Sequence, residues 1–306
     1  LGVYRIVFGC FVLIHLGLLS VDFDYWMTDA GLFRGEDAVK AAGMMRYSLF
    51  QWIQDPFSVR LITAGIACVT VGFTLGWQTK IMSILMYLGL LSIHHRNVAT
   101  SCGPDTLMMI TSFYLMLSPC GAAYSLDARR RALKRGTAAE PLIYPWAQRL
   151  IQIQVALIYF ATAAFKCHGS SWLGGTAIHY VLFNHEVGQF NLEWLASYPI
   201  IVNLMTYSAL IGEFSLAFLL WFRPSRKWIA LVGLGLHAGI VPLVNVPLFG
   251  EQMTALSLLF LAPDDLAALG RFLTAPARWL ARRTAAETAP EPAGWRQLEL
   301  AFNVTR

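Results

Sequence analysis

Charged side chains are scarce in this chain of 306 residues, because Asp, Glu, Lys and Arg together make up only 13% of it. Soluble domains carry about 25% charged residues. Hydrophobic residues make up 57% of the chain, and the mean hydropathy is +0.54. This composition excludes an ordinary soluble domain and indicates a polytopic membrane protein.

The short motifs of common enzyme classes are also missing. The sequence has no CxxC, HExxH, GxxxxGK[ST] or GxSxG motif. Two adjacent histidines, His94 and His95, would diverge on a helix and cannot form an i, i+4 metal-binding pair. We therefore expect no metal site. The basic residues lack interleaved aromatic residues, so we also expect no nucleic-acid partner.

The chain has instead eight hydrophobic segments. A helix needs about 20 apolar residues to cross the hydrocarbon core of a membrane. The sequence therefore predicts an all-α, polytopic transmembrane helix bundle over residues 1–262, followed at 263–306 by a cytoplasmic surface helix and a disordered tail. We expect the loop 94–104 to dip into the membrane and Asp105 to cap the next helix. The segments are 2–20, 57–76, 80–93, 105–118, 147–165, 198–222, 227–244 and 248–262.

Three groups of basic residues predict the orientation of the bundle. Lys and Arg accumulate in cytoplasmic loops, so eight spans with both termini in the cytoplasm place all three groups on the same side. The segments 21–56 and 167–197 then lie outside, and polar residues gather at the outer leaflet. This arrangement favours an outward-facing cavity that takes a lipid-soluble ligand sideways. The groups are Arg129, Arg130, Arg131, Lys134 and Arg135; Arg223, Arg226 and Lys227; and Arg271, Arg278, Arg282 and Arg283.

The uncharged segment 151–165 is followed directly by Lys166, and one face of the helix expected here is polar. Polar groups in lipid need partners, so this face should contact other helices or a wet cavity. Two interpretations of Lys166 stay open: a lysine at a helix end that extends toward the headgroups, or a functional base. The polar face consists of Gln148, Gln152, Tyr159, Thr162 and Lys166, which share one side at the helical period.

Other expected spans also carry polar residues. Glu213 lies near mid-membrane, where an unpaired carboxylate is expensive, so it should be protonated or paired with the first span or the lysine helix. His237 is either a structural hydrogen-bond partner or a catalytic group. The same alternatives apply to Arg5 and His15 in the first span.

Two of the five cysteines, Cys102 and Cys167, fall at the outer edge of consecutive antiparallel spans. An oxidising exterior would permit a disulfide between them, which would tie the loop 94–104 to the lysine helix. Two free thiols are the alternative.

Three blocks of sequence carry a resemblance to the HTTM family, the membrane domain shared with vitamin K-dependent gamma-carboxylases. The resemblance covers most of residues 1–262. The blocks are RNVATSCGPDTL with LSPCGAAYSLD, then PWAQRLIQIQVALIYFATAAFK with WLGGTAIHYVL, and then GEFSLAFLLWFR with LHAGIVPLVNVPLFGEQM.

The resemblance implies a catalytic role for Lys166 and His237. In the carboxylases the lysine that ends this helix deprotonates vitamin K hydroquinone, and the oxygenated quinone then removes a proton from glutamate, which takes up carbon dioxide. The family's histidine near the reaction centre falls on His237. The chain departs from the carboxylases at Phe165, where they have a second lysine, and at Ser101 or Thr100, where they have a histidine.

Two functions follow as hypotheses. The first is a multi-pass enzyme of the cell (inner) membrane, in a bacterial cell, that binds reduced vitamin K or menaquinone and carboxylates a Glu-containing peptide or protein on the outer side. The second is a non-catalytic membrane protein that binds lipid or assists peptide maturation or export. A cavity lined by both Lys166 and His237 would favour the enzyme. The expected cavity residues are Tyr159, Thr162, Asn97, Ser101, Asp105, Trp172, Glu213 and Asn245.

Overall fold

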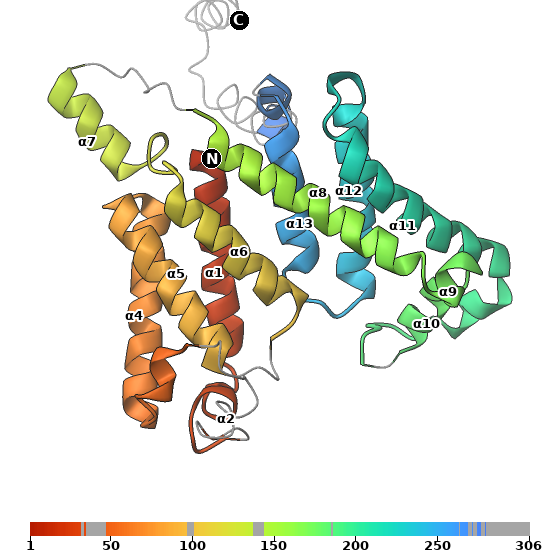
Figure 1. Ribbon diagram of the computed structural model, residues 1–306, viewed down its shortest axis with the longest axis horizontal. Helices are drawn as coiled ribbons and strands as arrows, with labels where there is room; N and C mark the ends of the chain where they lie inside the picture. Colours follow the sequence, from red (N-terminus) through yellow and green to blue (C-terminus); the bar gives the residue numbers. More distant parts are fainter. Residues whose placement is uncertain are drawn as a thin grey trace, which may run out of the picture. The chain divides into compact units, whose positions relative to one another are not determined.

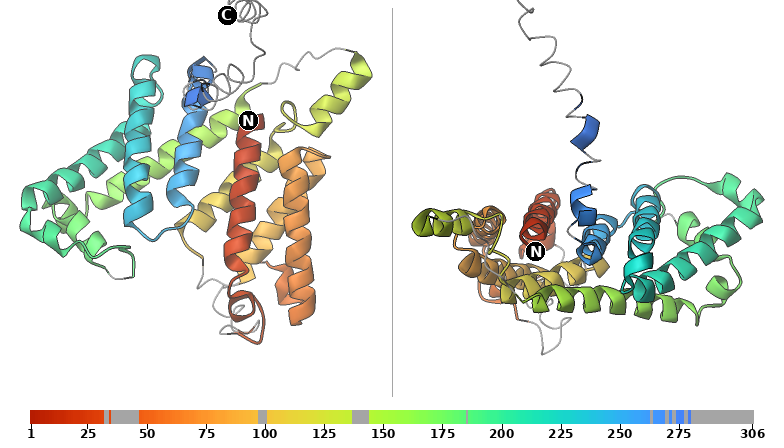
Figure 2. Two further views of the ribbon diagram at one scale, coloured as in Figure 1. Left: turned by 180° about the vertical axis from the view of Figure 1, so that it is seen from behind. Right: turned by 90° about the horizontal axis from the view of Figure 1, so that it is seen from above.

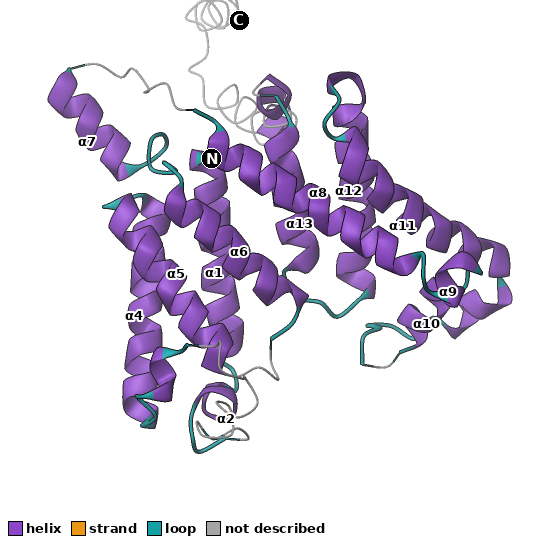
Figure 3. Ribbon diagram, in the orientation of Figure 1, coloured by secondary structure: helices purple, strands orange, loops and turns teal. Residues whose placement is uncertain are grey.

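The structure is a computed structural model that describes residues 1–31, 34, 47–96, 101–136, 144–184, 186–262, 264–268, 271, 274–276 and 279. Every regular element within these residues is a helix (Figure 3), apart from an isolated bridge between Gly188 and Val244. The chain divides into two compact units, Leu1–Phe260 and Leu261–Arg306. In the second unit residues 264–268 are helical, and most of the expected disordered tail lies outside the described residues.

Each of the eight hydrophobic segments overlaps one α-helix of the first unit (Figure 1). Among the described residues three helices are long and apolar enough to cross a membrane: α1 (Gly2–Leu19), α4 (Pro56–Leu75) and α11 (Pro199–Leu219). The last helix, α13 (Phe249–Ser257), has 9 residues and continues into the short 3-10 helix η4 (Leu258–Phe260). The chain is thus an all-helical membrane protein over its described residues. The other main helices are α5 (Thr79–Arg96), α6 (Gly103–Leu117), α8 (Trp146–Lys166) and α12 (Arg223–Leu243).

The first unit is built from two groups of helices. In the first group α1 packs on α4, α4 on α5, and α5 on α6; in the second, α8 packs on α11, α11 on α12, and α12 on α13. The long helix α8 also contacts α6, and α13 contacts α1 and α6, so these two helices join the groups (Figures 1 and 2). The shorter elements are α2 (Phe23–Met27), η1 (Leu49–Gln51), α9 (Ser170–Leu173), α10 (Ala177–Phe183) and η3 (Glu193–Ser197).

Local sequence explains where several helices begin and end. The carboxylate of Asp55 accepts a hydrogen bond from the Ser58 backbone N–H at 3.0 Å, which caps the first turn of α4. Gly76 ends α4 with φ +73°, a left-handed conformation that suits glycine. The basic loop expected after α6 is partly a helix, α7 (Leu126–Arg135). It forms because the Ser125 hydroxyl caps it and Arg and Lys are good helix formers.

The loop predicted at 94–104 is shorter than expected, because α5 continues through His94 and His95 to Arg96. Residues 97–100 lie outside the described residues. Asp105 is the third residue of α6 and not its cap as predicted; the cap is Cys102, whose backbone N–H donates to the Asp105 carboxylate at 2.9 Å. The carboxylate reaches back by one turn, as in a capping box.

Arg5 is fully buried near the start of α1 and has a structural role. Its guanidinium donates to the carbonyl oxygens of Cys120 at 3.1 Å and Tyr124 at 2.5 Å, both in the turn between α6 and α7. These bonds satisfy carbonyls that follow the end of α6 and fix α1 against them.

Candidate functional site

Lys166, the last residue of α8, forms an ion pair with Glu213 of α11. The ammonium Nζ donates to Glu213 Oε1, and the centroid of the Trp172 indole lies 4.6 Å from Nζ. Glu213 is buried, and its second oxygen, Oε2, has no hydrogen-bond partner among the described residues. The expectation that Glu213 is buried and paired with the lysine helix is therefore confirmed. The pair thus leaves one buried carboxylate oxygen without a partner among the described residues.

Two turns earlier on α8, Tyr159 contacts His237 of α12. The Tyr159 hydroxyl lies 2.8 Å from His237 Nε2 and 3.3 Å from the hydroxyl of Ser257 in α13. His237 is buried, and its Nδ1 has no partner among the described residues. One hydroxyl thus connects α8, α12 and α13, which is a structural role of the kind expected for a polar group inside a membrane protein.

The remaining members of the polar face divide into two kinds. Gln148 and Gln152 both donate to the carbonyl oxygen of Leu259, at 2.7 and 2.8 Å. Thr162 is exposed and donates to the carbonyl of Ile158 in its own helix at 2.9 Å. The polar face predicted for α8 therefore does contact neighbouring helices, except at Thr162.

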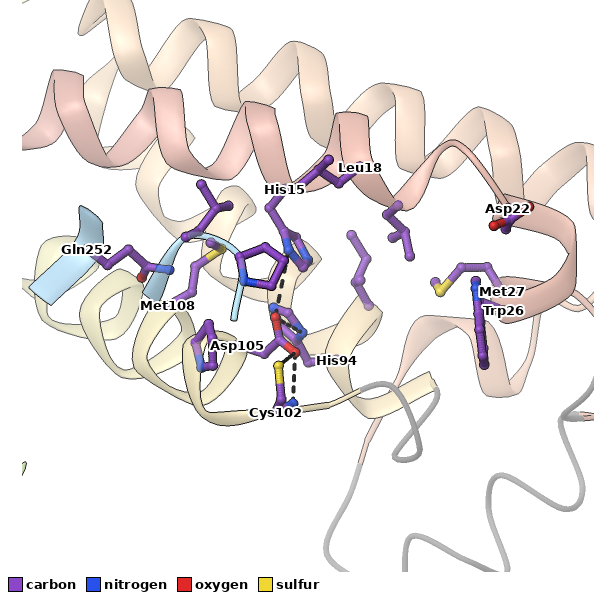
Figure 4. Close-up of a pocket in the computed structure, with 15 residues that line it drawn as sticks. His15, Leu18, Asp22, Trp26, Met27, His94, Cys102, Asp105, Met108 and Gln252 are labelled. Carbon is purple, nitrogen blue, oxygen red and sulfur yellow. Dashed lines mark hydrogen bonds and ion pairs between the residues drawn. The ribbon is translucent and has the colours of Figure 1, made fainter. Parts of the chain in front are cut away.

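A cavity of about 380 Å³ lies elsewhere, between α1, the end of α5, the start of α6 and the turn before α13. Apolar side chains make most of its wall, including Leu18, Met27 and Met108. Three titratable side chains meet in this wall (Figure 4). They are His15 of α1, His94 of α5 and Asp105 of α6, whose possible ligand atoms lie within 4.8 Å of one another.

The predicted cavity residues do not all lie together. Asp105 lines the 380 Å³ cavity, whereas Asn245 lines a separate one of about 280 Å³ with Gln189 and Glu251. Ser101 is in the loop just before α6. Neither of these cavities includes the six predicted residues Tyr159, Thr162, Lys166, Trp172, Glu213 and His237. Asn97 lies outside the described residues.

The possible disulfide is not formed, because both Cys102 and Cys167 are free thiols. The Cys102 thiol instead lies 3.3 Å from Asp105 Oδ2, where it acts as a donor to the carboxylate. The Cys102 thiol thus takes part in the hydrogen bonding at the start of α6.

The residues that sequence reasoning missed are contributed by separate helices. His15 and His94 were noticed singly, but their sequence positions do not show that both face Asp105. Ser257 was not noticed, because one serine in a hydrophobic segment is common. The available signal was a polar residue inside each of several apolar segments.

Comparisons with known proteins agree with a membrane assignment. The family model described as HTTM domain matches residues 1–264. The "Uncharacterized protein YitO" of Bacillus subtilis (strain 168) is similar, with 19% identity over 245 residues, which covers 72% of this chain and 69% of that protein. No solved structure matches this chain.

Proposed function

We propose that this chain, which belongs to the HTTM domain family, is a membrane enzyme that binds a reduced quinone and removes a hydroxyl proton from it at Lys166. HTTM is the membrane domain found in vitamin K-dependent carboxylases. The observation that supports the proposal is the ion pair of Lys166 with the buried Glu213 at the end of α8. When bound, reduced vitamin K or menaquinone supplies an acidic hydroxyl and the electrons for reaction with oxygen.

Lys166 and Glu213 together can accept and store a proton. Transfer of one proton from Nζ to Glu213 Oε1 converts the ion pair into a neutral amine and a neutral carboxylic acid. The amine is then a general base for a substrate hydroxyl. Its protonated form is stabilised by the indole of Trp172.

The ligand would reach this pair from the lipid-facing side of α8. The side chain of Lys166 is 22% exposed, and neighbouring Phe165 and Thr162 are exposed. Tyr159 acts as a positioning residue, because its bonds to His237 and Ser257 hold α8 against α12 and α13. His237 is thereby part of the support for the site.

The proposed setting is a multi-pass protein of the inner cell membrane, with eight spans, both termini in the cytoplasm and Lys166 toward the outside. The second substrate is a Glu-containing peptide that approaches from that side. In a chain whose five native cysteines, all free thiols, are replaced by serine, a cysteine placed at position 135 should react with an impermeant maleimide only after cells are opened. Labelling in intact cells would contradict this orientation.

The catalytic proposal is tested in nanodiscs that contain reduced menaquinone and oxygen, with quinone epoxide and carboxylated Glu peptide measured as products. Loss of a general base typically costs 10²–10⁴-fold in rate, so Lys166→Arg should lower product formation by about 100-fold or more because guanidinium stays protonated. Lys227→Arg is the matched control, since Lys227 is exposed near the start of α12, and it should act like the unmodified protein. Full turnover by Lys166→Arg would refute the role of Lys166 as base.

A second function, lipid binding without catalysis, is favoured by one observation. The apolar cavity of about 380 Å³ is lined by neither Lys166 nor His237. A protein that binds menaquinone, detected by quenching of tryptophan fluorescence, but forms no product under any of these conditions would have this second function.

A further inference from the structure

We propose that His15, His94 and Asp105 bind a divalent transition-metal ion at the wall of the 380 Å³ cavity. The three residues come from α1, α5 and α6, so the site would tie together three helices of one group. This inference does not depend on the role of Lys166, which lies outside this cavity.

The geometry of the three side chains is close to that of a metal site. His15 Nδ1 lies 3.7 Å from Asp105 Oδ1, and His94 Nδ1 lies 4.0 Å from the same oxygen (Figure 4). With metal–ligand distances of about 2.1 Å, neighbouring ligand atoms are roughly 3–3.5 Å apart. Shifts of less than about 1 Å would therefore bring all three atoms into the first coordination shell.

Two of the three side chains are buried, the His15 side chain is 19% exposed, and the hydrogen bonding of the cluster is incomplete. His94 is 4% exposed and Asp105 is 6% exposed. The Nε2 atoms of His15 and His94 have no hydrogen-bond partner among the described residues. The closest Nδ1–Oδ1 contacts are also longer than a hydrogen bond. A bound cation would compensate the buried carboxylate, which is otherwise costly.

A supporting shell fixes the direction of the carboxylate. Asp105 Oδ2 accepts from the Cys102 backbone N–H at 2.9 Å and from its thiol at 3.3 Å. The other oxygen, Oδ1, is thereby turned toward both imidazoles. Second-shell bonds of this kind orient metal ligands and raise metal affinity. His95 does not take part, because its Nδ1 faces the carbonyl of Tyr47 at 3.1 Å.

The donor set identifies the class of metal. Two imidazoles and one carboxylate suit Fe²⁺, Zn²⁺ and neighbouring first-row ions, whereas Mg²⁺ and Ca²⁺ prefer oxygen ligands. Three protein ligands leave coordination positions open. Those positions would face a cavity with apolar walls, where a ligand from the bilayer could approach the ion. The alternative is a cluster in which the two imidazoles and the carboxylate share a proton and no metal binds.

Cobalt provides a direct test, because Co²⁺ in a nitrogen–oxygen site absorbs visible light. The full chain is purified through a tag without histidine, stripped with chelator and titrated with Co²⁺ in detergent. We expect one ion per chain, displaced by Zn²⁺. His94→Ala and Asp105→Asn should weaken binding by at least about 10–100-fold. His168→Ala is the matched control and should bind as the unmodified chain does, because His168 is exposed and bonds its own helix.

A second measurement avoids any dependence on the folding of the variants. X-ray absorption of the cobalt-loaded, unmodified chain should show two imidazole ligands at about 2.0–2.1 Å. Binding of less than one equivalent, a spectrum without two imidazoles, or undiminished binding by folded His94→Ala would each overturn the proposal and support the proton-sharing cluster.

Discussion

The ion pair between Lys166 and Glu213 should contribute to stability far more than an exposed pair does. Its side chains are 22% and 11% exposed, respectively. Removing one partner of a buried pair costs about 3–5 kcal/mol, because the other charge stays buried without compensation. We therefore expect Lys166→Met to lower the free energy of unfolding by about 3 kcal/mol or more. Glu213→Gln should cost less, since the amide oxygen still accepts a hydrogen bond.

The double variant isolates the interaction between the two residues. Lys166→Met with Glu213→Gln leaves no buried charge at this place, so its cost should be smaller than the sum of the single costs by about 2–3 kcal/mol. Unfolding in mixed micelles, followed by circular dichroism, gives the four free energies. The exposed pair of Arg60 and Asp24, with side chains 59% and 43% exposed, provides the control. Arg60→Met should cost less than about 1 kcal/mol. If Lys166→Met costs no more than Arg60→Met, the pair is not buried in the folded protein and the reasoning is wrong.

Three further substitutions test the packing of the bundle and the start of α7. Gly89→Ala should destabilise the bundle by about 1–3 kcal/mol, because the added Cβ would lie 2.8 Å from the Ile66 side chain. Gly65→Ala should instead stabilise the bundle by about 0.5–1 kcal/mol, because the space around Gly65 is open. Equal effects of the two substitutions in thermal unfolding would refute this reasoning. Partial burial would raise the pKa of Asp127, but hydrogen bonds from Thr79 and Gln78 outweigh it and lower that pKa. The stabilisation by Asp127 is therefore present above the unfolded pKa of about 4 and lost as pH falls through the lower folded value. Asp127→Asn should destabilise at pH 7 and lose its effect at low pH; a constant difference across this range would contradict the assignment.

The helices of the bundle could be predicted from the sequence because each is encoded locally. Apolar runs mark where backbone groups must bond within a helix to avoid lipid. The helix α7 was missed because its Arg and Lys residues indicate a cytoplasmic segment but not its conformation. The extension of α5 through His94 was missed for a similar reason, since polar residues at the end of an apolar run do not show where the helix stops.

The candidate sites could be predicted only in part. Lys166 was evident because it closes an uncharged helix, and its pairing with Glu213 followed from the cost of a lone carboxylate in a membrane. The meeting of His15, His94 and Asp105 could not be predicted, because it depends on how three helices are rotated about their axes. The resemblance to the carboxylases drew attention to Lys166 and His237, and the expectation of no metal site considered only ligands close together in sequence.

The carbonyl of Leu259 accepts hydrogen bonds from both Gln148 and Gln152, and this has a consequence for engineering the protein. A carbonyl oxygen has two lone pairs, so both are used by α8. These two hydrogen bonds hold the chain one residue before its compact unit ends at Phe260. Sequence changes beyond Phe260, such as a fused reporter or a purification tag, should leave the membrane unit undisturbed.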